Sequence, residues 1–253
     1  MKLNIVPAAR GMQWVKLGFR TFMKQPLALA ALLFMYATIA LMLLVIPLVG
    51  PLLVSAMVPI ATLGLMAASR VAEGSGFPMP TILFTAFRAN RERIRAMLVL
   101  GAIYAAMVVG IESLVALMVP IPTDGKTLQD VFESQAFGTS LVLSAAMYLP
   151  VSVLFWHAPA LVHWHGVPPV KSLFFSAVAC LRNARAFLVY GLVWFAIIVA
   201  IVAASALAAA VSPWLSGVVF GAGSTIVTIA FYVSIYFTFR DSFLDDDNPG
   251  VTP

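Results

Sequence analysis

Glu112 is the residue whose type and position most directly suggest chemistry. It is the only acidic residue inside the long apolar segments of the chain. A carboxylate within a membrane is a candidate functional group because burying it costs free energy. Glu112 also lies only about two helical turns before Pro120, where it could reach water or pair with Lys126. Two interpretations therefore stay open: a proton- or cation-coupling residue, or an acid at the outer end of its helix.

All three histidines of the protein occur in one stretch, "WHAPALVHWHG", at residues 156–166. Metal or haem ligation needs imidazoles that converge on one point. On a helix, however, His157 and His163 lie far apart around the axis, and His163 and His165 point to nearly opposite sides. Tryptophans adjoin them, so the stretch is more typical of an aromatic belt at a membrane interface. We expect no metal site and no cofactor.

Four arginines fall within the eight residues "RANRERIR" at 88–95. Taken alone, such a cluster suggests the recognition of phosphate groups, in nucleic acids or in phospholipid headgroups. The sequence contains no Walker loop, nucleophile elbow, HExxH or paired-cysteine motif, so it predicts no enzyme activity. The elements that surround the arginines decide between the remaining targets.

Composition excludes a water-soluble globular protein. Of 253 residues, 62% are apolar and 10% are charged, whereas soluble domains have roughly 25% charged residues. A helix needs about 20 mostly apolar residues to cross a bilayer, so the chain reads as an all-α integral membrane protein. Six segments meet this length, and none has Lys or Arg in its apolar core: 27–47, 51–69, 96–119, 139–163, 187–210 and 214–239.

The basic residues predict the orientation of the chain. Fourteen of the fifteen Lys and Arg residues fall on one side of these spans, and only Lys126 falls on the other. The positive-inside rule then places both termini in the cytoplasm of a bacterial inner membrane. The N-terminal segment carries five cations and no cleavable signal pattern, so we expect the first span to be retained. The single cysteine, Cys180, falls on the reducing side and forms no intrachain disulfide.

An internal repeat organises the basic segments. The stretch 76–101 matches 166–191 without gaps at a shift of 90 residues, pairing Arg95 with Arg185 and Gly101 with Gly191. A weaker third copy occupies 8–36, so the chain reads as three units, each an interfacial helix followed by two spans. Such units could form a bundle with a pseudo-threefold axis or a linear array. The expected units are 8–70, 78–164 and 168–240, followed by an acidic cytoplasmic tail at 241–253.

Helical projection predicts that each unit begins with an amphipathic helix lying flat in the membrane interface, its apolar side in the acyl region and its cations among the headgroups. The expected apolar faces are Gly11, Trp14, Val15, Gly18 and Phe22; Ile82, Leu83, Ala86, Phe87 and Ile94; and Leu173, Ala177, Cys180 and Ala184. The candidate headgroup-binding residues are Lys16, Arg20, Lys24, Arg88, Arg91, Arg95, Lys171, Arg182 and Arg185.

Smaller signals concern packing. Gly217 and Gly221 stand in GxxxG register, which favours close contact inside the bundle or against a partner. Pro59, Pro150 and Pro159 predict kinks in the second and fourth spans. In the tail, Asp241 begins an acidic run that is either solvated or folded back onto the arginines, or that docks a partner.

The N-terminal stretch "GMQWVKLGFRTFMKQP" at 11–26 contains the pattern GxxWxxxGFxxFxxxP. In this pattern the chain resembles a family of proteobacterial six-span inner-membrane proteins, and the likeness covers essentially the whole chain. The resemblance implies a membrane location and a multi-span fold. It supplies no catalytic residues.

These observations lead to one expected function and one alternative. The first is a non-enzymatic, membrane-organising or accessory component of a larger membrane complex, whose basic interfacial helices bind anionic phospholipids. Its expected partners are those lipids and either another membrane protein or a second copy of the chain, with no nucleic acid. The alternative is a small transporter or flippase for a lipidic or anionic substrate, in which Glu112 takes part in coupling.

Overall fold

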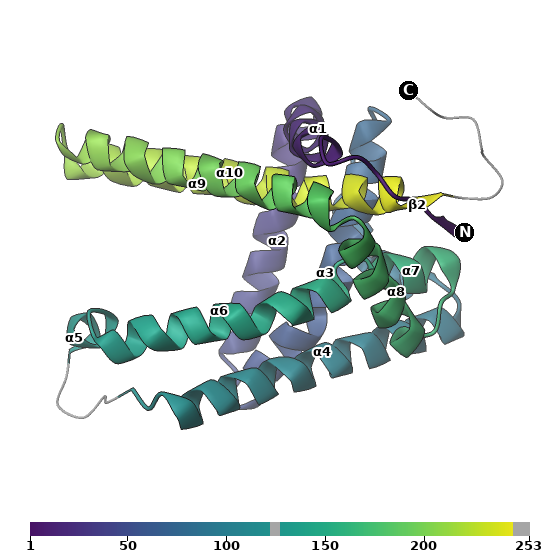
Figure 1. Ribbon diagram of the computed structural model, residues 1–253, viewed down its shortest axis with the longest axis horizontal. Helices are drawn as coiled ribbons and strands as arrows, with labels where there is room; N and C mark the ends of the chain where they lie inside the picture. The colour runs from purple at the N-terminus through teal and green to yellow at the C-terminus, as the bar shows by residue number, and fades with distance from the viewer. Residues whose placement is uncertain (122–126, 245–253) are drawn as a thin grey trace.

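The structure, a computed structural model, describes residues 1–121 and 127–244 and is almost entirely helical (Figure 1). Six stretches in this part of the chain are long and apolar enough to cross a membrane: α2, α3, α4, α6 with α7, α9 and α10. The elements are β1 (Lys2–Leu3), α1 (Arg10–Lys24), α2 (Pro26–Leu44), α3 (Val49–Glu73), the 3₁₀ helix η1 (Pro80–Arg88), α4 (Arg91–Met118), α5 (Leu128–Phe132), α6 (Gln135–Phe155), α7 (Ala158–His165), α8 (Pro169–Arg182), α9 (Ala184–Ala209), α10 (Pro213–Ser242) and β2 (Phe243–Leu244).

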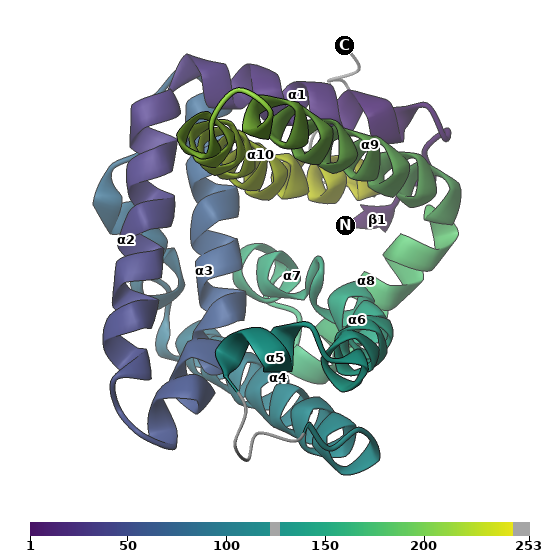
Figure 2. The same cartoon turned by 90° about the vertical axis from the view of Figure 1, so that its left-hand side faces the viewer.

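The short helices pack mainly on hairpins that are not their own. Helix α1 contacts α9 and α10, η1 contacts α3 and α2, and α8 contacts α6 and α7. Thus η1 lies against the two long helices of the preceding expected unit, and α8 lies against the broken second span of its preceding unit. Helix α1 lies against the two long helices of the last unit (Figure 2). An amphipathic helix needs cover for its apolar face, and here much of that cover is protein.

The three hairpins do not share one direction. The α4–α6 and α9–α10 hairpins run in roughly the same direction on opposite sides of the molecule, whereas α2–α3 runs across them (Figures 1 and 2). This differs from a bundle of parallel spans about a pseudo-threefold axis. The physical reason lies in α3, where small residues including Gly64, Ala67 and Ala68 are buried. They let α3 contact η1, α4, α7 and α10 together.

Both chain ends lie on the same side of the molecule, because β1 pairs antiparallel with β2 and joins Lys2 to Leu244 and Leu3 to Phe243. We call this region the inner end. It comprises β1, β2, α1, α8, the first turns of α9 and the last turns of α10. The main core lies here: it includes Trp14, Tyr190, Trp194 and Phe237. The core therefore forms where the amphipathic helices meet the long ones.

The second basic segment is divided differently from the prediction. We expected one amphipathic helix to carry Arg88, Arg91 and Arg95, but η1 ends at Arg88 and α4 begins at Arg91. The break occurs because Ala89 and Asn90 are extended, and the Asn90 side chain accepts a hydrogen bond from the Arg93 backbone N–H. Asparagine in this role is a strong helix N-cap. The later arginines thus belong to the first turns of a long helix.

The fourth span and the C-terminal segment also differ. Helix α6 ends at Phe155, and α7 restarts at Ala158 with Pro159 in its first turn, so the chain breaks before Pro159 instead of bending at it. Helix α10 continues to Ser242, two residues into the segment expected to be an acidic tail. It continues because Asp241 is held by partners in the core, as described below. Phe243 and Leu244 of that tail form β2, and residues 245–253 lie outside the described residues.

Candidate functional site

The predicted headgroup-binding cations are all exposed. They lie on α1 (Lys16, Arg20, Lys24), at the end of η1 (Arg88), at the start of α4 (Arg91, Arg95), on α8 (Lys171, Arg182) and at the start of α9 (Arg185). Lys24 donates a hydrogen bond to the Glu73 carbonyl oxygen over 2.6 Å. The other eight make no hydrogen bond or ion pair within the described part of the chain, so we call them the free cations. Their charges remain available to a ligand.

Helix α1 has the predicted faces, but its apolar side is covered by protein and not by acyl chains. Trp14 is 0% exposed. A Cβ atom placed on Gly11 would come within 2.1 Å of the Ala186 carbonyl oxygen, and one on Gly18 within 2.6 Å of that of Ala230. The glycines therefore let α1 lie directly on α9 and α10. Only its cationic side remains for the headgroup region.

Helix α8 is oriented differently from the prediction. Its buried residues are Ser172, Ser176, Ala179 and Cys180, and of the predicted apolar face only Cys180 is among them. The Ser176 hydroxyl donates to the Val153 carbonyl oxygen and accepts from the His157 backbone N–H, both over 2.9 Å. These bonds satisfy backbone groups freed at the α6–α7 break. They turn the small polar residues inward.

The opposite side of α8 carries large exposed apolar side chains, including Val170, Phe174 and Leu181. On η1, Phe84 and Phe87 are likewise exposed. Exposed aromatic and aliphatic groups beside cations are typical of a surface that enters the lipid interface. These two short helices therefore have the membrane-facing apolar side that α1 lacks.

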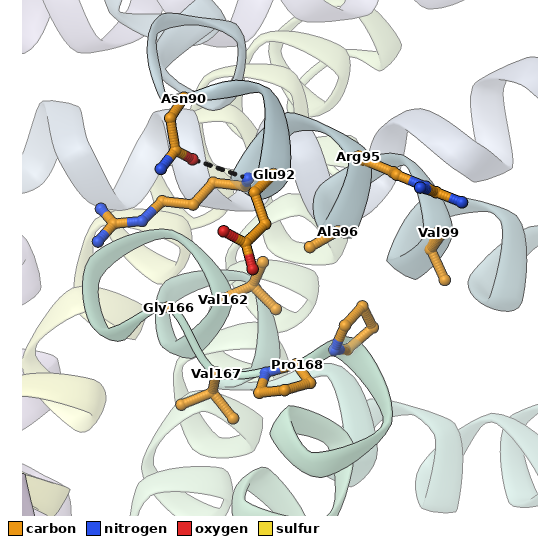
Figure 3. Close-up of a pocket in the computed structure, with 11 residues that line it drawn as sticks. Asn90, Glu92, Arg95, Ala96, Val99, Val162, Gly166, Val167 and Pro168 are labelled. Atoms are coloured by element: carbon orange, nitrogen blue, oxygen red, sulfur yellow. Dashed lines mark hydrogen bonds between the residues drawn. The ribbon is translucent and has the colours of Figure 1, made fainter.

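A cavity of about 420 Å³ lies between the start of α4 and the segment that links α7 to α8. Gly166 ends α7 with φ of +66°, a backbone conformation that favours glycine, and so turns the chain past α4. In Figure 3 the Glu92 carboxylate is directed from α4 toward the linking segment, and Arg95 extends from the same helix past Val99. Ala96, Val99 and Val162 add apolar wall.

Charge in this cavity is partly held in place. The Arg93 guanidinium donates to the His163 carbonyl oxygen over 2.9 Å, which ties α4 to α7. Glu92 and Arg95 both line the cavity, and neither makes a hydrogen bond or ion pair among the described residues. The cavity thus offers one carboxylate, two guanidiniums, of which that of Arg93 is held by a carbonyl oxygen, and an apolar wall.

Of the three histidines, His157 lies in the core and not in an interfacial belt, whereas His163 and His165 are half-buried. His157 is 0% exposed, and its ring packs against Phe187, Phe239 and Phe243. The Trp156 indole donates to Thr238 over 3.0 Å. His157 is buried because the α6–α7 break turns it toward the last turns of α10. Within the described ranges, no three His, Cys, Asp or Glu residues are placed to hold a metal ion.

Glu112 is exposed on α4 and accepts a hydrogen bond from the Tyr148 hydroxyl of α6 over 2.8 Å. A second cavity, of about 310 Å³, is lined by Glu112, Ser140 and Ser144. Twenty residues separate Glu92 from Glu112, about 30 Å along a helix and close to the thickness of the hydrocarbon core. The two carboxylates therefore lie near opposite ends of α4. Lys126, the partner considered for Glu112, lies outside the described residues.

A charged cluster joins the two chain ends, and the sequence did not predict which residues form it. The Asp241 carboxylate accepts from the Arg10 guanidinium over 2.6 Å and from the Trp14 indole over 2.8 Å. It also pairs with Arg240, whose guanidinium bonds to Glu73 over 2.5 Å. The alternative of an acidic segment folded back onto arginines holds for Asp241. No local signal links residues so far apart in the chain, although an aspartate directly after an arginine at a helix end was visible.

The chain was compared with known proteins at the level of family, sequence and structure. It is 35% identical to a probable inner membrane protein of Burkholderia thailandensis over 260 aligned positions, which cover 96% of this chain and 94% of that protein. No family model matches the chain. No solved structure matches it. The identity extends over nearly all of both chains and agrees with the six long apolar helices, so the chain belongs to the same family of inner membrane proteins as the Burkholderia protein.

Proposed function

We propose that this protein is a non-enzymatic inner-membrane protein that binds anionic phospholipid headgroups through its exposed cations and acts as a membrane-organising or accessory component of a larger complex. The observation that carries the proposal is the set of eight free cations, all exposed. Arg10 and Arg240, by contrast, are paired with carboxylates. Cations that make no ion pair among residues 1–121 and 127–244 fit a role toward an external anion.

The membrane supplies such an anion. Each Lys or Arg near an anionic leaflet gains about 1 kcal/mol, so eight free cations suffice for stable retention of lipid. The exposed apolar sides of α8 and η1 would enter the interface between these cations. The predominance of Lys and Arg on one side supports a cytoplasmic location for both termini. The accessory role is supported by the exposed apolar side chains of α9 and α10, among them Phe195, Leu207 and Phe220, which a partner could cover.

Removal of free cations tests the proposal. We expect the variant Arg88→Gln/Arg91→Gln/Arg182→Gln/Arg185→Gln to retain several-fold less phosphatidylglycerol than the unmodified protein, because four headgroup contacts are lost. Native mass spectrometry of protein extracted in mild detergent counts the bound lipids and any stoichiometric partner. The matched control replaces the same arginines by lysine, which keeps the charge. Equal phosphatidylglycerol retention by the Gln and Lys variants would contradict lipid binding, and a monomer carrying only lipid would contradict the accessory role.

A second candidate, transport of a lipidic or anionic substrate, is favoured by one observation. Glu112 and Tyr148 form a polar pair beside a cavity between two long helices. A transporter would use this carboxylate for coupling. Glu112→Gln should then reduce substrate-dependent flux in proteoliposomes while leaving expression unchanged, and unaltered flux would sink this assignment.

A further inference from the structure

We propose that the cavity between α4 and the α7–α8 link binds a phospholipid headgroup that carries both a primary ammonium and a phosphate, as phosphoethanolamine does. The inference rests on the lipid-binding function proposed above and names the lipid class for one site. Its basis is the combination of two unpaired opposite charges, from Glu92 and Arg95, with an apolar wall in one cavity of about 420 Å³.

The charges argue against simpler ligands. A purely anionic headgroup such as phosphatidylglycerol would place its phosphate in a cavity that Glu92 also lines, and like charges there are unfavourable. A simple cation would face Arg95 and the nearby Arg93, whose guanidinium is held by the His163 carbonyl. A zwitterion satisfies both groups, with its ammonium at the carboxylate and its phosphate at the guanidinium.

The positions on α4 set the orientation of the ligand. Glu92, Ala96 and Val99 follow at helical spacing along one stripe of α4, and Arg95 lies beside that stripe. Glu92 and Arg95 thus lie nearer the first turn of α4 than the apolar Ala96 and Val99. A lipid bound with its headgroup at Glu92 and Arg95 would lay its acyl chains along Ala96 and Val99. This arrangement favours a whole lipid over a free headgroup.

A primary ammonium is preferred over a quaternary one for a chemical reason. It can donate hydrogen bonds to the Glu92 carboxylate, and a charge-assisted hydrogen bond is about twice as strong as a neutral one. A trimethylammonium has no such donor. The site should therefore bind phosphatidylethanolamine better than phosphatidylcholine.

Native mass spectrometry of the full-length protein with equimolar phosphatidylethanolamine and phosphatidylglycerol tests this assignment. Glu92→Gln should retain about tenfold less phosphatidylethanolamine, while bound phosphatidylglycerol stays the same or rises. Glu92→Asp keeps the charge and should restore much of the binding. The matched control is Glu133→Gln, which removes an exposed carboxylate that directly follows α5 and does not line this cavity, and should leave phosphatidylethanolamine unchanged.

Three results would overturn the inference: unchanged phosphatidylethanolamine in Glu92→Gln, an equal loss in Glu133→Gln, or equal retention of phosphatidylcholine by the unmodified protein. Excess soluble glycerophosphoethanolamine should not displace the lipid. Displacement at concentrations equal to those of the lipid would overturn the assignment to a membrane lipid. Because the two lipids are counted separately, failure of the general proposal appears in phosphatidylglycerol and failure of this one in phosphatidylethanolamine.

Discussion

The two halves of the α9–α10 hairpin have the same apolar composition and opposite environments. In the inner half, Tyr190 and Trp194 of α9 and most residues of α10 from Ile229 to Ser242 are buried. In the outer half, residues 195–228, no residue is buried, and Trp214 is 76% exposed. The inner half packs against α1, whereas the outer half has apolar surface for lipid or a partner. Hydrophobicity alone therefore does not define the core of this protein.

Glycines show the same contrast between the two halves. Gly18 of α1 lies directly on α10, whereas a Cβ placed on Gly217 or Gly221 would meet nothing within 4 Å. The GxxxG register predicted close contact inside the bundle or against a partner. Within the described chain it makes no such contact, which leaves lipid or a partner. The glycines that join α1 to this hairpin are Gly11 and Gly18, seven residues apart.

The largest effect on the free energy of unfolding should come from a bulky side chain at a glycine that contacts another helix. Gly18→Leu would drive a side chain into the Ala230 carbonyl oxygen and Ser234, and we expect a loss of about 3 kcal/mol or more in the free energy of unfolding. Gly217→Leu, in the open outer half, should change it by less than about 0.5 kcal/mol. Thermal unfolding in detergent measures both. Equal destabilisation by the two variants would remove the distinction between the halves.

An intermediate effect should follow from removal of a charge at the inner end. Asp241→Asn weakens bonds to Arg10, Trp14 and Arg240 around a buried carboxylate, and we expect a loss of about 3 kcal/mol or somewhat less. The outer half offers a matched test in the hydrogen bond between the Ser205 and Ser216 hydroxyls, 3.0 Å apart. Ser205→Ala should cost less than about 1 kcal/mol. Chemical denaturation compares them, and a larger loss for Ser205→Ala would reverse the expected order.

The smallest effect concerns Cys180, and it is measured as the rate at which maleimide labels the thiol of the folded protein. Burial raises the pKa of this thiol to about 12, against a partly compensating hydrogen bond from Ser176. The thiol stays protonated at pH 8, so maleimide should label it at least about tenfold more slowly than Val211→Cys, which stands at a 78% exposed outer position. Because the folded pKa is raised, the stability from the neutral thiol is complete below pH 9.0 and is lost as pH rises toward 12. Equally fast labelling of both sites would show that the inner end opens readily.

Sequence patterning predicted what depends on local periodicity. The six apolar helices and the buried face of α1 with Trp14 are confirmed by the structure. The predicted helix faces were wrong where the helix is interrupted, because the residues after a break no longer continue the same helical spacing. Asn90 separates Arg88 from Arg91, and the α6–α7 break turns His157 inward. The repeat also did not predict packing: Gly101 touches Ala56 on α3, whereas its counterpart Gly191 faces open space.

The sequence by itself determined the class of the protein. Its apolar length specifies helices that can cross a membrane, and its Lys and Arg residues are concentrated between and before these helices on one side, because both properties follow from local composition and spacing. The tertiary structure alone decided which apolar faces are covered by protein, that Asp241 joins the two chain ends, and that Glu92 and Arg95 share a cavity with Val162. These contacts join distant segments. They depend on how the hairpins pack, which no local pattern encodes.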